Sequence, residues 1–170
     1  NNANDAGGGI ANLGNATLSI TSSTISNNKS GVGGGVGNNG GSPAINDVVI
    51  KESTISGNIS SVEGSALWTD AGGAISLINV TISSNSGAGS AIYLINSAVT
   101  ATNSTIAFNT SQSGPGGINI LAGIRVKNTI IANNTGPGGN CGGGKVANND
   151  GNIQFPGSGC NDAIPVTNPL

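Results

Sequence analysis

The chain has 170 residues, of which 30 are glycine and 7% are charged, and its formal net charge is −2. Disordered chains combine scarce apolar residues with high net charge, so 35% hydrophobic residues with almost no net charge favour a folded chain. The cations are too scattered to form the patch that phosphate binding requires, which argues against a nucleic-acid partner; they are Lys29, Lys51, Arg125, Lys127 and Lys145.

A six-residue phrase built on Thr-Ile-Ser recurs along the chain and sets its organisation. The first copy is Ser23 to Asn28, and the later copies drift in their flanking letters. Successive copies lie 30, 27, 24 and 25 residues apart when counted at their central isoleucine, which is Ile25, Ile55, Ile82, Ile106 and Ile131. A period of 20 to 50 residues is typical of a solenoid, so we expect stacked repeats over residues 1–135.

Each repeat is predicted to hold three short strands joined by turns. The first strand follows paired glycines or other small residues and begins near Ile10, Val36, Leu67, Ile92 and Ile118. The second carries two apolar residues spaced by two, which places both on one face of a strand; the pairs are Leu18 and Ile20, Val48 and Ile50, Ile75 and Leu77, Val99 and Ala101, and Ile124 and Val126. The third strand is the Thr-Ile-Ser phrase with its isoleucine inward. Such coils bury an apolar column only by stacking, and this pattern predicts an all-β parallel β-helix of about five to six coils.

An asparagine stands three residues after each inward isoleucine: Asn28, Asn58, Asn85, Asn109 and Asn134. Asparagines at the same corner of successive coils can hydrogen-bond to one another and to the turn backbone. We expect this asparagine ladder to be structural rather than a binding site.

The residues that flank the inward isoleucines form a possible surface array of hydroxyl and methyl groups: Thr24, Ser26, Thr54, Ser56, Thr81, Ser83 and Thr105. A flat, regular array of this kind could order water as an ice-binding surface does. The simpler reading is that threonine is a good residue for an exposed strand position. The array ends at Ala107, Ile130 and Ala132.

The longest turns are expected at 38–45, 60–64, 69–73 and 110–116, where a solenoid places a specific binding surface. Trp68 is the notable side chain there. A lone aromatic side chain can stack on a sugar or cover a gap between coils, and we favour the second role.

The periodicity dissolves after residue 135, and residues 136–170 are interpreted as a Gly-rich cap or junction of the same domain. The two cysteines, Cys141 and Cys160, are expected to form a disulfide in an oxidising compartment, with two buried thiols as the alternative. Closing a loop of about 20 residues would stabilise the fold by roughly 3 kcal/mol.

The repeats resemble those of bacterial right-handed parallel β-helix surface proteins, of the polymorphic-outer-membrane-protein-like and CSLREA or choice-of-anchor types. The resemblance rests on segments 7–12, 18–20, 23–26, 72–75 and 108–109, and on the region from Asn140 through Cys160 to Leu170. It implies a right-handed helix in a secreted or cell-surface protein that serves in adhesion or as an extracellular structural element.

Enzymatic chemistry is not expected, and neither is a cofactor or metal. Glycoside hydrolysis needs two carboxylates close together, whereas the acidic residues do not align at matching repeat positions; they are Asp5, Asp47, Glu52, Glu63, Asp70, Asp150 and Asp162. The chain has no histidine for general acid–base work near neutral pH. Among the Asn-X-Ser/Thr sequences, Asn15, Asn79 and Asn103 are the candidate glycosylation sites.

The expected function is therefore that of a non-catalytic extracellular or cell-surface structural or adhesive module. Strand edges at the ends of a β-helix invite pairing, and little surface charge opposes it. Expected partners are a second copy stacked end to end into a fibre, neighbouring coils of a longer parent chain, or a surface glycan. Ice binding and carbohydrate binding or degradation are the alternatives. No apolar run approaches the roughly 20 residues that span a bilayer, so no transmembrane segment is expected.

Overall fold

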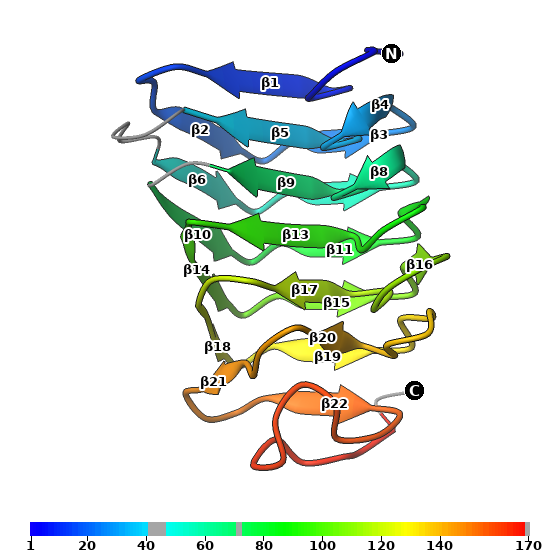
Figure 1. The fold of residues 1–170 in the computed structure, drawn as a ribbon. Coiled ribbons are helices and arrows are strands. Elements are labelled where there is room, and N and C mark those ends of the chain that lie inside the picture. Colours follow the sequence, from blue (N-terminus) through cyan, green and yellow to red (C-terminus); the bar gives the residue numbers. More distant parts are fainter. Residues whose placement is uncertain (41–46, 71–72, 169–170) are drawn as a thin grey trace.

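The computed structural model describes residues 1–40, 47–70 and 73–168, and all their regular secondary structure is β. Strands that follow one another along the chain lie in different sheets, and strands one coil apart pair in parallel (Figure 1). The result is three six-stranded sheets and one four-stranded sheet. The predicted parallel β-helix is confirmed.

Each six-stranded sheet takes one strand from every coil, and every sheet is named here after its first member. The β1 sheet contains β1 (Ile10–Leu13), β5 (Val36–Asn39), β9 (Leu67–Asp70), β13 (Ile92–Ile95), β17 (Ile118–Ile120) and β20 (Cys141–Gly142). The β2 sheet contains β2 (Leu18–Thr21), β6 (Val48–Lys51), β10 (Ala74–Ile78), β14 (Ala98–Thr102), β18 (Ile124–Lys127) and β21 (Ala147–Asn148). The β3 sheet contains β3 (Thr24–Ser26), β7 (Thr54–Ser56), β11 (Thr81–Ser83), β15 (Thr105–Ala107), β19 (Ile130–Ala132) and β22 (Ile153–Phe155).

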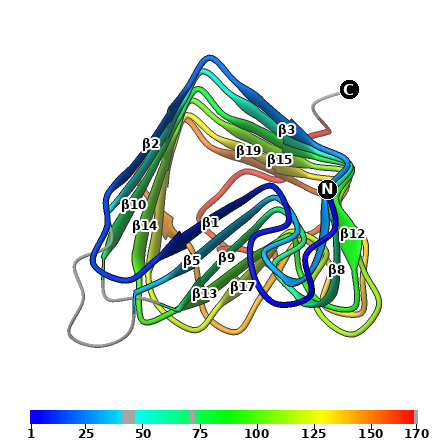
Figure 2. The same ribbon diagram turned by 90° about the horizontal axis from the view of Figure 1, so that it is seen from above.

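The three long sheets form the sides of a triangle when the molecule is viewed from its N-terminal end (Figure 2). From that end the chain runs clockwise through β1, β2 and β3 as it moves away from the viewer, so the helix is right-handed. Right-handed crossovers are the rule for parallel strands because of strand twist.

The core fills the interior of this triangle because one row of side chains per strand points inward. All five repeat isoleucines are buried, as are the inward pairs of the second strands, except that Leu18 in the first coil is only partly buried. The register places each isoleucine directly beside the next, as in Ile55 beside Ile82 and Ile82 beside Ile106. Each coil therefore covers the apolar residues of its neighbours, as the pattern predicted.

A fourth sheet, which the sequence did not predict, forms a lobe beside the β1 sheet at one corner of the triangle (Figure 2). This β4 sheet contains β4 (Lys29–Val32), β8 (Ile59–Glu63), β12 (Ser86–Gly87) and β16 (Thr110–Ser111). The expected turn at 60–64 is thus largely a strand, and the expected turn at 110–116 begins with one. These strands are short and rich in serine and glycine, so they carry no apolar alternation that would announce them. Part of the expected turn at 38–45, and residues 71–72 of the one at 69–73, lie outside the described residues.

Two corners of each coil require a residue in the left-handed backbone region. The first lies between the second and third strands and is occupied by Ser22, Glu52, Asn79, Asn103, Asn128 and Asp150. The second follows the third strand and is occupied by Asn27, Gly57, Ser84, Phe108 and Asn133. Their φ angles lie between 48° and 64°, where asparagine and glycine are favoured and a bulky residue such as Phe108 is unusual.

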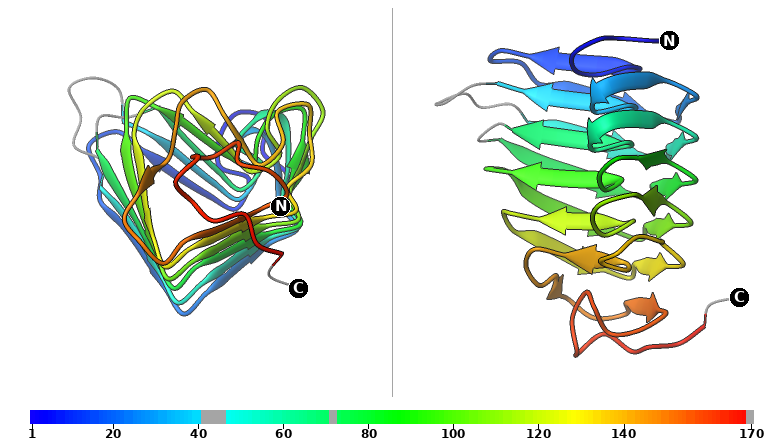
Figure 3. Two further views of the ribbon diagram at one scale, coloured as in Figure 1. Left: turned by 90° about the horizontal axis from the view of Figure 1, so that it is seen from below. Right: turned by 45° about the vertical axis from the view of Figure 1, so that its right-hand side comes forward.

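The C-terminal segment continues the stack and then closes it. Strands β20, β21 and β22 extend the three long sheets, after which Val166 pairs with Gln154 on the next edge. Cys141 and Cys160 form the expected disulfide, with a Cα–Cα distance of 4.8 Å. The chain after β22 crosses the end of the stack, and Cys160 and Ile164 join the core there (Figure 3).

At the N-terminal end β1, β2 and β3 are the edge strands of their sheets. Residues 1–6 run instead beside the lobe, where Asn2 pairs with Lys29 and Ala6 with Val32. The two ends of the stack are therefore different.

Candidate functional site

The asparagine ladder is buried and structural, as expected. From Asn58 onward, each asparagine Oδ1 accepts two bonds from the previous asparagine, one from its backbone N–H and one from its Nδ2. Between Asn58 and Asn85 both distances are 3.0 Å. The Asn85 Nδ2 group also donates to the Ile55 carbonyl at 2.9 Å, which ties the ladder to the third strand of the coil above. The amides are thus consumed by the fold and are not available to a ligand.

The ladder has a sixth member that sequence reasoning missed. Asn140 Oδ1 accepts from the Asn134 backbone N–H at 3.0 Å and from its Nδ2 at 2.9 Å. Asn140 Nδ2 in turn donates to the carbonyls of Phe155 and Pro156. Because Asn140 lies only six residues after Asn134, it does not follow the repeat spacing that predicts the other members of the ladder.

Two further polar columns occupy the other corners. At the corner before the third strand, a hydroxyl accepts the N–H from the coil above, as Ser53 does from Ser23 and Ser104 from Val80. Near the end of the first strand of each coil, Asn12 donates to Asn38 at 2.8 Å, and the Thr69 hydroxyl lies 2.8 Å from that of Ser97, which follows β13. In these columns the buried polar groups are hydrogen-bonded to one another, as buried polar groups generally are in folded proteins.

The Thr/Ser array lies on the outward face of the β3 sheet in exact register. Thr24, Thr54, Thr81 and Thr105 are lateral neighbours, and Ser26, Ser56 and Ser83 form the adjacent row. Toward the C-terminal end the same rows continue as Ile130 and Ile153, and as Ala107, Ala132 and Phe155. No charged residue occurs in these six strands, all of which the structure describes.

The candidate glycosylation sites divide by burial. Asn15, Asn79 and Asn103 are exposed, whereas the sequon asparagines of the ladder, Asn28, Asn58 and Asn109, are buried. The exposed Asn103 accepts a hydrogen bond from Asn128 Nδ2 at 3.1 Å. The first three thus remain the accessible acceptors.

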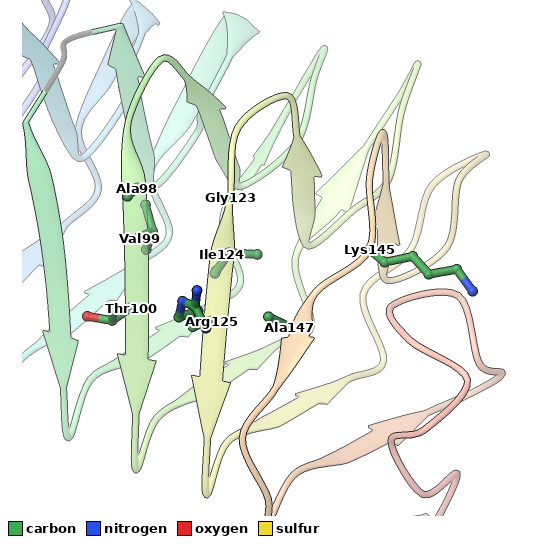
Figure 4. Close-up of a pocket in the computed structure, with 8 residues that line it drawn as sticks. All are labelled: Ala98, Val99, Thr100, Gly123, Ile124, Arg125, Lys145 and Ala147. Atoms are coloured by element: carbon green, nitrogen blue, oxygen red, sulfur yellow. The ribbon is translucent and has the colours of Figure 1, made fainter.

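A shallow hollow of about 290 Å³ lies on the outward face of the β2 sheet, over β14, β18 and β21 (Figure 4). Arg125 and Lys145 line it, but Lys145 extends away from Arg125 and pairs with Asp162 at 2.6 Å. That bond holds the pKa of the exposed Asp162 carboxyl below its ordinary value. Two cations that point apart do not make a converging site.

The residues that converge most lie on the outward face of the β1 sheet, where Trp68 and Tyr93 are lateral neighbours on β9 and β13. Both are partly exposed, and Asn119 follows in the same row. Trp68 was expected beside a loop and is instead in the middle of a strand. The sequence contains a signal that places Tyr93 beside Trp68. Each aromatic residue directly follows a similar phrase, Ser65-Ala66-Leu67 or Ser90-Ala91-Ile92, and therefore occupies the same position in its coil.

The lobe forms a wall beside this aromatic pair. Gly64, which has a φ of 64°, turns the chain from the lobe back into β9, and a Cβ at Gly64 would lie 2.6 Å from the Cβ of Trp68. Glu63 precedes it and accepts the Ser90 N–H at 3.0 Å. A side chain at Gly89 would collide with the Glu63 carboxylate. Glu63 and Gly64 of this wall therefore lie close to the start of β9 and to the turn at Gly89 before β13.

Two carboxylates flank the pair. Asp70 lies two residues after Trp68 on the same face and accepts a bond from Asn96 Nδ2 at 3.1 Å. Burial raises the pKa of Glu63, although its bond with Ser90 opposes the rise. Burial also raises the pKa of Tyr93, and the charges of Glu63 and Asp70 add to the effect, so both carboxylates act on the phenol. Glu63 and Asp70 do not occupy matching positions in the repeats, so the sequence did not predict that both would lie near Tyr93.

No family model, curated protein or solved structure matches the chain. Within residues 1–40, 47–70 and 73–168, no three His, Cys, Asp or Glu side chains are grouped closely enough to hold a metal ion. The described part of the chain also has no helix of the length and apolar character needed to cross a membrane. The fold shown is a right-handed parallel β-solenoid closed by a disulfide-linked C-terminal segment.

Proposed function

We propose that the protein is a non-catalytic structural or adhesive module that works outside the cell or at its surface. The observation that carries the proposal is that the interior polar groups and the outward sheet faces have different roles. Buried amides and hydroxyls are largely consumed by ladders that hold the coils together, and the functional groups that remain lie on extended, nearly flat sheet faces. Such faces suit contact with a large surface better than chemistry on a small molecule, which uses an enclosed pocket.

The disulfide supports the extracellular setting, because disulfides persist mainly in oxidising compartments. The edges of β1, β2 and β3 support an additional role in assembly with a second copy or with further coils, since unpaired edges pair with added strands. Analytical ultracentrifugation over a hundredfold range of concentration tests this role. Concentration-dependent association supports it, and a constant monomer counts against it.

Bead adhesion tests the main proposal. Inert beads that carry the folded domain should attach to films of cellulose, mannan or mucin more strongly than beads that carry serum albumin. The same films should release no reducing sugar on prolonged incubation with the soluble domain. Attachment no better than albumin on every film would overturn the adhesive function, and accumulating reducing ends would overturn the non-catalytic assignment.

Ice binding is a second candidate, favoured by the exact register of four threonines on the uncharged face of the β3 sheet. Evenly spaced methyl and hydroxyl groups on a flat face can order a layer of water. The domain should then inhibit ice recrystallisation, and Thr81→Lys, at the centre of the face, should abolish the effect while leaving the thermal melt unchanged. Thr100→Lys, on the outward face of the β2 sheet, is the matched control. A wild-type domain without inhibition excludes this candidate.

A further inference from the structure

We infer that Trp68 and Tyr93, with Glu63 and Asp70 beside them, form a binding site for a neutral saccharide chain. The inference rests on the proposed adhesive function and names its ligand class. It begins from the scarcity of aromatic residues: Trp68 and Tyr93 are the only Trp and the only Tyr in 170 residues, and the fold places them side by side on one outward face.

The two rings provide the apolar part of the site. Neighbouring strands lie about 4.8 Å apart, so both side chains can contact the same chain of sugar rings. A pyranose has a face of C–H groups and a rim of hydroxyls, which matches an aromatic side chain with an apolar body and a polar tip. The rings are only partly buried, so part of their surface is available to a ligand.

The polar groups around the rings match the hydroxyl rim. Asp70 lies on one side and Glu63 on the wall at the other, and each carboxylate accepts one bond from a protein group. An ionised carboxylate has about four acceptor positions, so each keeps capacity for sugar hydroxyls. Asn119, the next residue in the aromatic row, adds an amide that can both donate and accept.

Charge selects among saccharides. The strands of the β1 sheet carry Asp70 and no Lys or Arg. The lobe strands add Glu63 and one cation, Lys29, which pairs with Ile59 at the opposite end of β8 from Glu63. A polyuronate or sulfated glycan would bring like charge to this face without a cation to pair with it, and unpaired like charges in contact are unfavourable. A neutral chain meets no such penalty. The site thus differs in position and chemistry from the uncharged Thr/Ser face.

Trp68 is the only tryptophan, so its fluorescence can report saccharide binding at this site. The intrinsic fluorescence of the intact domain would be titrated with cellohexaose, xylohexaose, mannohexaose and N-acetylchitohexaose, and with hexagalacturonate as the acidic probe. At least one neutral hexasaccharide should cause a saturable change, and hexagalacturonate should cause none. Tyr93→Ala should weaken the binding at least about tenfold, which corresponds to about 1.4 kcal/mol and is reasonable for a lost aromatic contact. Thr81→Ala, on the β3 sheet, should bind like wild type.

Tyr93→Leu guards against loss of folding, because it keeps apolar bulk while removing the ring and the hydroxyl; it should melt near the wild-type temperature and bind as weakly as Tyr93→Ala. The inference is overturned if no neutral hexasaccharide gives a saturable change, if folded Tyr93→Leu binds like wild type, or if hexagalacturonate binds more tightly. Beads that carry Tyr93→Leu separate the two proposals. Undiminished attachment would place the adhesive function on another face, whereas wild-type beads that never attach would overturn the adhesive function and leave the saccharide site to be decided by the titration.

Discussion

Phe108 has a backbone conformation that is unfavourable for its residue type. It occupies the left-handed corner after the third strand, with a φ of 57°, and its side chain is 49% exposed. Residues other than Gly, Asn and Asp are strained in this region, and a phenylalanine that is only about half buried offsets only part of the strain. Phe108→Asn should therefore raise the free energy of unfolding by about 0.5 to 1 kcal/mol in urea titrations with an unchanged slope.

Gly57 occupies the equivalent corner two coils earlier and is the matched control. Gly57→Ala introduces at that corner the strain that Phe108→Asn removes, and its Cβ would also lie 2.7 Å from Asn27 Oδ1, so it should lower the unfolding free energy by about 1 kcal/mol or more. A loss of stability in Phe108→Asn would mean that the phenylalanine side chain contributes more through packing than its backbone costs.

Glu63 makes stability depend on pH. Its folded pKa is raised above its unfolded value by burial, so the folded state binds its proton more tightly than the unfolded state. The stabilisation from the bound proton is fully present below the unfolded pKa and is lost as pH rises through the folded pKa. Glu63→Gln removes the ionisation, so it should be more stable than wild type at pH 7, and the difference should shrink by pH 4. Parallel thermal melts at both values check this. A constant difference would assign the effect to packing.

At the scale of the strand and its corner, the ladder is the feature that joins coils most directly. The Asn85 side chain takes part in five bonds: it accepts two from Asn58 and donates to Asn109 and to the carbonyls of Ile55 and Ser83. Asn85→Ala would leave several of these buried groups without a partner, at about 1 to 3 kcal/mol each, so the unfolding free energy should fall by about 3 kcal/mol or more.

Thr81→Ala in the same coil is the control, because an exposed strand residue should change stability by no more than about 0.5 kcal/mol. Both variants can be compared by urea unfolding at neutral pH. If Asn85→Ala and Thr81→Ala lost equal amounts of unfolding free energy, the ladder would not contribute measurably to the stability of the fold.

Strands and corners could be predicted from the sequence where one residue type recurs at the same position of successive coils. Elements without such a recurring residue could not be predicted. The isoleucine column and the asparagine ladder repeat at matching positions in five successive coils, so their inward placement could be predicted and is confirmed. The lobe has no such signature, because its short strands are mostly serine and glycine and pair through backbone groups common to all residues. The aromatic pair fell between these cases, since one Trp and one Tyr do not make a visible repeat until the coils are aligned.

For the whole molecule, a stack in which each coil touches only its neighbours should come apart from its weaker end. The disulfide closes the last coil over a separation of 19 residues, and a link of this span is worth about 3 kcal/mol. The double variant Cys141→Ser, Cys160→Ser should lose about that much. Amide hydrogen exchange should rise first in β20, β21 and β22 while β7 and β11 stay protected. Uniform loss of protection would instead indicate one cooperative unit.

The burial of Ile82 tests the register across the whole stack. Its side chain is 1% exposed and lies between Ile55 and Ile106. Ile82→Asp places an unpaired carboxylate in the core, which costs several kcal/mol and should unfold the domain as seen by circular dichroism. Ser83→Asp, one residue later and outward, should leave it folded. A folded Ile82→Asp variant would contradict the register.

The ladder also gives the molecule an electrical direction. In the bonds between rungs, from Asn28 to Asn140, every NH₂ group donates toward the C-terminal end and every oxygen accepts from the N-terminal side. Hydrogen-bonded dipoles in a row polarise one another, so the column behaves as a single aligned dipole. Its positive end is already neutralised by the carbonyls of Phe155 and Pro156. Reversing one amide would oppose it to both neighbours, which makes the orientation of the whole row an all-or-none property.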